Sequence, residues 1–131
     1  MPISISWYSD SQRMIQARFI GQWDVSDFIT VLENSASMMR QVSHPVHVIY
    51  DFSTSTATPR DLLAGFHFAN RILPSNQAVV VYVNANSVIK AFVLMAKRTG
   101  LPAAKYIYNA ESREDAYRLI IDKAHRVQQS A

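Results

Sequence analysis

The sequence has no cysteine and only three glycines among its 131 residues. The absence of cysteine excludes disulfide bonds, thiolate nucleophiles, iron–sulfur clusters and cysteine-ligated zinc. With so few glycines, no glycine-rich loop can bring its backbone close to a phosphate, and no Gly-x-Ser-x-Gly, His-Glu-x-x-His or P-loop motif occurs. The four histidines form no metal-ligand pattern. We therefore predict a non-enzymatic protein with no cofactor and no metal.

Long hydrophobic runs and clustered charge are also missing. The apolar blocks 78–83 and 91–96 fall well short of the ~20 residues that cross a bilayer, and the N-terminus has no signal-peptide pattern. The net charge is +3, but the basic residues nowhere form a run, which argues against nucleic-acid binding. About half of the residues are apolar, enough for one packed domain. We expect a single domain over residues 1–131 that is soluble and cytoplasmic, with no membrane span.

Hydrophobic periodicity predicts an α/β fold with the element order β-β-α-β-α-β-α-β-α. Two N-terminal strands form a hairpin, and strands and helices then alternate. The order predicts one mixed, mostly parallel sheet with an antiparallel N-terminal hairpin, and helices covering the sheet. The predicted strands are 3–7, 14–20, 46–52, 78–83 and 106–108, and the predicted helices are 24–42, 58–73, 87–99 and 112–129. Thr58, Ser87 and Ser112 are the predicted N-caps of the last three helices, and Gly100 is the predicted left-handed residue after the third.

The most site-like region is the edge where the parallel strands end, because such folds usually bind ligands there. Loops 51–60, 84–87 and 109–112 meet at this edge. The candidate residues of a ligand-binding or regulatory loop are Asp51, Ser53, Thr54, Ser55, Thr58, Asn84, Asn86 and Asn109. A lipid, nucleotide or anion is the alternative ligand class, with an apolar lining from Tyr50, Phe52 or Phe66.

Less specific interpretations of the same residues stay open. A phospho-acceptor site needs further acids to hold magnesium, and Asp51 has no acidic neighbour before Asp61, so capping of loop amides at the strand end is the favoured interpretation of Asp51. The hydroxyls of 53–58 can satisfy their own backbone, accept a phosphate at the following helix, or be a kinase target.

The segment Val48-Ile49-Tyr50-Asp51-Phe52-Ser53, placed between two helices, resembles the apolar strand ending in Asp-Leu-Ser of STAS domains. These domains include bacterial anti-sigma-factor antagonists and the cytoplasmic tails of sulfate transporters. The resemblance implies a regulatory fold that binds protein partners. The family's next signature, Asp-Ser-Ser-Gly-Leu, contains a phosphorylated serine, but here the matching positions are Thr58-Pro59-Arg60-Asp61-Leu62. Both the serine and the glycine are missing, so the phosphorylation switch does not carry over.

The predicted helix 87–99 has more apolar residues than one buried stripe requires. Phe92, Leu94 and Met95 are the candidate interface residues, for a protein partner or for self-association as a homodimer. The alternative is a central helix of a small compact fold. The pair Met38-Met39 raises the same question, because methionines suit contact surfaces and cores alike.

Overall fold

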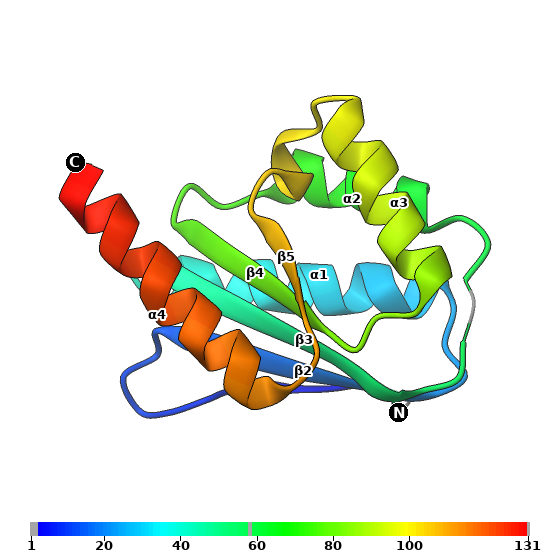
Figure 1. Ribbon diagram of the computed structural model, residues 1–131, viewed down its shortest axis with the longest axis horizontal. Helices are drawn as coiled ribbons and strands as arrows, with labels where there is room; N and C mark the ends of the chain where they lie inside the picture. Colours follow the sequence, from blue (N-terminus) through cyan, green and yellow to red (C-terminus); the bar gives the residue numbers. More distant parts are fainter. Residues whose placement is uncertain (1–2, 58, 131) are drawn as a thin grey trace.

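The computed structural model describes residues 3–57 and 59–130, with side chains up to residue 124. Its elements follow the predicted order (Figure 1). They are β1 (Ile3–Trp7), β2 (Met14–Gly21), α1 (Val25–Arg40), β3 (Val46–Ser55), α2 (Leu62–Ile72), β4 (Gln77–Val83), α3 (Ser87–Arg98), a 3-10 turn η1 (Pro102–Ala104), β5 (Ile107–Ala110) and α4 (Arg113–Ser130).

The five strands form one sheet in the order β1-β2-β3-β4-β5. β1 pairs with β2 antiparallel, and the other neighbours pair in parallel. The predicted mixed sheet with an N-terminal hairpin is therefore confirmed. Among the described residues, no helix is both long and apolar enough to cross a membrane.

The helices cover the two faces of the sheet unequally. In Figure 1, α4 crosses in front of the sheet and α1 lies behind it. α2 packs against α1, and α3 packs against α2. The buried side chains accordingly form two clusters, a large one under α1, α2 and α3 and a small one under α4. Both clusters follow from strand alternation, which sends successive side chains to opposite faces.

Aromatic rings dominate the larger cluster and fix the geometry of α1 and α2. Phe19 stacks on Phe52 with ring centroids 4.5 Å apart, and Phe28 meets Phe66 edge to face at 6.0 Å. Gly65 lies against Phe28, where an added Cβ would come within 2.8 Å of the ring. The two helices can approach this closely because position 65 has no side chain.

β3 is longer than predicted and changes the boundary of the candidate loop. The prediction ended the strand at Phe52, but β3 continues to Ser55. The reason is pairing: after a register shift, Ile20 and Gly21 of β2 pair with Thr54 and Ser55. Asp51 therefore lies within a strand instead of at its end.

The helix starts also differ from prediction at two places. α2 begins at Leu62, after an N-cap residue Asp61 whose side chain makes no capping bond, and the predicted cap Thr58 lies outside the described residues. Asn86, not Ser87, caps α3, because its Oδ1 accepts a hydrogen bond from the backbone N–H of Ile89 at 2.9 Å.

The other predicted helix ends agree more closely with the structure. The Ser112 hydroxyl caps α4 by accepting from Asp115 N–H at 3.1 Å, as predicted. Gly100 has the predicted left-handed backbone, with φ +74°.

Candidate functional site

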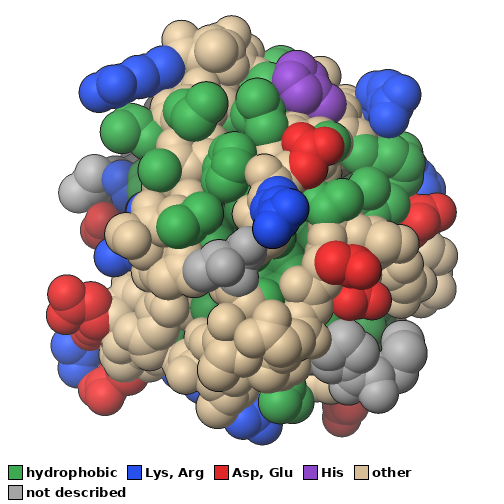
Figure 2. Space-filling model, turned by 90° about the vertical axis from the view of Figure 1, so that its right-hand side faces the viewer, with side chains coloured by type: hydrophobic (Ala, Val, Ile, Leu, Met, Phe, Trp, Pro, Cys, Tyr) green, Lys and Arg blue, Asp and Glu red, His purple; other side chains and the backbone are tan. Residues whose placement is uncertain are grey.

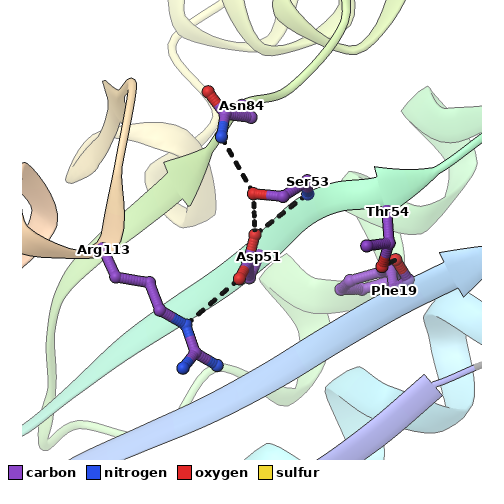
Figure 3. A network of polar contacts seen from close by, with 6 residues as sticks. All are labelled: Phe19, Asp51, Ser53, Thr54, Asn84 and Arg113. Atoms are coloured by element: carbon purple, nitrogen blue, oxygen red, sulfur yellow. Dashed lines mark hydrogen bonds and ion pairs between the residues drawn. The ribbon is translucent and has the colours of Figure 1, made fainter.

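Four polar residues from three segments meet where β3, β4 and α4 come together (Figure 3). Strand alternation places Asp51 and Ser53 on the same face of β3, the face that α4 covers. Asn84 directly follows β4, and Arg113 is the first residue of α4. We call Asp51, Ser53, Asn84 and Arg113 the carboxyl-edge network.

Asp51 is the centre of the network. It is a buried residue whose Oδ2 accepts a hydrogen bond from Arg113 Nε at 3.1 Å, forming an ion pair. Its Oδ1 accepts from the backbone N–H of Ser53 at 2.9 Å and from the Ser53 hydroxyl at 2.5 Å. Both carboxylate oxygens are thus engaged and the charge is balanced. The described residues contain no cluster of three or more His, Asp or Glu that could hold a metal with it.

Asn84 completes the network from the neighbouring strand. Its side-chain Nδ2 donates to the Ser53 hydroxyl at 2.8 Å, so that hydroxyl donates to Asp51 and accepts from Asn84. The Asn84 backbone has φ 55°, a left-handed conformation that asparagine tolerates better than most residues. The network therefore links β3 to the turn after β4 and to the start of α4 through side chains.

Arg113 was not among the candidate residues predicted from the sequence. It is 62 positions away from Asp51, and no motif joins the two. The available signals were weak: a cation directly after the N-cap Ser112, and an unpaired acid in an apolar strand. Only the crossover of α4 over the sheet brings them together.

The structure brings Asp51, Ser53 and Asn84 together but separates the other candidates from them. Thr54 lies on the opposite face of β3 and donates to the carbonyl oxygen of Phe19 at 3.3 Å. Ser55 accepts from Trp23 Nε1 at 2.7 Å.

The two remaining described candidates lie elsewhere on the same edge. The Asn86 side chain caps α3 and donates to the carbonyl oxygen of Ala57 at 3.1 Å. Asn109 is exposed on β5, two positions after the core residue Ile107, so alternation places it on the face opposite Asp51. Neither residue takes part in the carboxyl-edge network.

The proposed apolar lining is not at this edge. Tyr50, Phe52 and Phe66 are packed into the larger core cluster, each at most 3% exposed. The Tyr50 hydroxyl hydrogen-bonds the Ser35 hydroxyl at 3.2 Å, and burial raises the pKa of Tyr50 to about 12.

Two hollows lie between α1, α2 and β4, on the opposite face of the sheet from the carboxyl-edge network. They enclose about 220 and 310 Å³, including open solvent above them. They share Leu32, Tyr50, Ala69 and Gln77 among their lining residues.

The predicted interface residues on α3 are exposed to different degrees. Leu94 and Met95 are 48% and 49% exposed, whereas Phe92 is half-buried and packs against the core. By contrast Met39 is buried in α1 and Met38 packs against the same core, so these methionines fill the interior.

Comparison with models of protein families gives no match for this chain, and comparison with curated proteins gives none either. Solved structures do match. The Bacillus cell-fate determinant SpoIIAA in its phosphorylated form aligns with a TM-score of 0.53 at 12% identity, over 88% of this chain and 99% of SpoIIAA. The same anti-sigma-factor antagonist in its unphosphorylated form aligns with a TM-score of 0.59 at 12% identity, over 89% and 95%. The chain has a STAS-like fold. The predicted resemblance is thereby confirmed at the level of architecture.

Proposed function

We propose that this chain is a non-enzymatic regulatory domain that acts by contacting proteins. The observation that carries the proposal is the pair of half-exposed apolar side chains, Leu94 and Met95, on α3 of a STAS-like fold. Large apolar side chains gathered on one helix favour a contact surface over a catalytic one. A cytoplasmic location is part of this proposal.

The carboxyl-edge network supports a non-catalytic role. The Asp51 carboxylate is buried and already accepts three hydrogen bonds, two from Ser53 and one from Arg113, which leaves little of it open to a substrate. We propose that the network instead locks the start of α4 to β3 and to the turn after β4. Arg60 occupies the position that matches the regulatory serine of STAS domains, so we propose no phosphorylation switch there.

Self-association through α3 is the form of this proposal that is simplest to test. In a two-fold dimer the same patch faces itself, so Leu94 and Met95 would lose their exposure to water. The same contact would also bring Lys90, Lys97 and Arg98 near their copies, since α3 has three cations and no acid. Because salt screens that repulsion, we expect the dimer to strengthen as the salt concentration rises.

The first experiment is light scattering with native mass spectrometry on one purified sample. We expect a dimer without a retained small molecule, and a shift to monomer in Leu94→Asp. Ile121→Asp is the matched control, because Ile121 is a 68% exposed apolar residue on another helix, α4. A monomeric wild-type protein that carries a stoichiometric small molecule would contradict the proposal.

A small-ligand module is the second proposed function, and Arg113 is the observation that favours it. Its Nε pairs with Asp51, while the two terminal nitrogens point away from the carboxylate (Figure 3). The side chain is 39% exposed, so an anionic ligand could reach it from solvent. If the same mass spectra show a retained anion, Arg113→Gln should remove it, whereas Arg71→Gln, which removes an exposed cation at the end of α2, should not.

A further inference from the structure

The positive charge of the chain is concentrated in one part of the fold, although the basic residues look scattered in the sequence. Residues 60–105 contain six basic residues and one acid, a balance of +5. Residues 1–59 have a balance of −2 and residues 106–131 a balance of zero, which together give the net +3. The segment 60–105 forms α2, β4, α3 and η1, and β4 carries no charge. The excess charge therefore lies on and beside α2, α3 and η1, whereas α1 of the same layer, with its cap, carries Asp24, Asp27, Glu33 and Arg40.

Helix α3 presents cations and apolar side chains on the same outward face. Its buried residues are Ile89, Val93 and Ala96. On the other side, Lys90, Leu94 and Arg98 follow one another at a spacing of four and form a row along the helix. Val88 and Met95, 38% and 49% exposed, lie beside that row. We call Val88, Lys90, Leu94, Met95 and Arg98 the α3 face.

An exposed aromatic residue and another cation follow η1, the turn that packs against α3. Tyr106, after η1, is 45% exposed and Lys105 lies over its ring at 5.3 Å. Figure 2 views the molecule from the side on which α3 begins, and hydrophobic side chains gather there together with side chains of both charges. The two hollows described above lie between α1, α2 and β4.

An anionic lipid surface fits these features better than other occupants do. A helix whose outward face has apolar residues between cations resembles an interfacial helix, whose apolar side chains enter the headgroup layer. Lysine and arginine stems lie along the acyl boundary while their charged ends reach the phosphates. A second copy would bring the cations of this face near one another unless salt screens them, and a nucleic acid would leave Leu94 and Met95 without an apolar contact.

We propose that the α3 face docks the domain peripherally on a membrane that contains anionic lipids. This goes beyond the proposed function, and the two compete for Leu94 and Met95. They also respond to salt in opposite ways, because salt weakens attraction to anionic headgroups while it strengthens a dimer of like-charged faces.

The test is co-sedimentation of the purified full chain with vesicles of phosphatidylcholine alone and of phosphatidylcholine mixed with phosphatidylglycerol. We expect binding to the mixed vesicles only, weakened by salt. Lys90→Gln and Arg98→Gln should each lower the partition coefficient by about fivefold, the effect of roughly one cation at an anionic surface. Leu94→Ser should lower the partition coefficient as well, although it removes no charge, because the apolar contact with the acyl boundary is lost.

The matched control is Arg18→Gln, which removes an exposed cation from β2 instead of from α3. If Arg18→Gln and Lys90→Gln lowered the partition coefficient equally, the proposal would be overturned, because binding would then follow net charge alone. Absence of vesicle binding would overturn it too. So would binding of poly-glutamate that depends on α3 without vesicle binding, which would identify an acidic protein as the occupant. A dimer seen by light scattering without lipid would leave the proposed function standing in each of these cases.

Discussion

Replacing Gly65 with alanine should destabilise the protein, although alanine is the better helix former. A Cβ at position 65 would come 2.8 Å from Cδ1 and 3.1 Å from Cε1 of Phe28. Phe28 is fully buried and its ring contacts four other rings, so it cannot move aside freely. Overpacking costs about 1–3 kcal/mol, and helix propensity returns about 1 kcal/mol. We therefore expect a net loss of about 1 kcal/mol.

The measurement is equilibrium urea denaturation with thermal unfolding as a second probe. A loss of this size corresponds to a decrease in melting temperature of about 3–6 °C. In a Phe28→Leu background, where the ring is absent, the same Gly65→Ala change should be neutral or stabilising, and the double-mutant cycle isolates the contact. If Gly65→Ala raises the stability of the otherwise wild-type chain by about 1 kcal/mol, as propensity alone predicts, the close approach of α1 and α2 is refuted.

Three further predictions concern buried polar groups. Asp51→Asn should lower the free energy of unfolding by about 1 kcal/mol, because Arg113 loses its ion pair but is exposed enough to be solvated; unchanged urea midpoints would contradict this. Burial lowers the pKa of His47, whose Nδ1 accepts from Val79 N–H, so the unfolded chain binds the proton more readily and stability should fall as pH drops through about 6.5. His47→Gln should flatten that pH dependence of the denaturation midpoint. Burial raises the pKa of Tyr50 to about 12, so ultraviolet titration of folded wild type and Tyr50→Phe should differ only near that pH.

Most of the architecture could be predicted from the sequence because local signals and topology rules agree. Alternating strands, helical periodicity and the Ser112 cap each predict the same element order. The predictions were wrong where a contact between distant segments sets the end of an element. β3 extends to Ser55 because β2 pairs with it, and no local pattern in the polar run 53–56 indicates that pairing.

The candidate site was less predictable for the same reason. Asp51, Ser53 and Asn84 could be expected at one edge because parallel strands end there. Arg113 could not, because its contact depends on the angle at which α4 crosses the sheet. The excess of basic residues over 60–105 can be counted in the sequence, but that the elements carrying them pack together is known only from the contacts of α2, α3 and η1.

One face of the sheet is covered by α4 alone, so we expect α4 to protect that face from association with other chains. It is the helix that packs over Ile49, Val79, Val81 and Val83, which are all nearly inaccessible to solvent. Without it, adjacent parallel strands would expose this group of β-branched, uncharged side chains to other chains, which is the composition of segments that associate as stacked sheets. A cut between β5 and α4 would therefore convert a well-packed domain into a self-adhering one, even though the larger aromatic core would remain in place. We therefore expect the C-terminal helix to protect the sheet from association, in addition to contributing to stability.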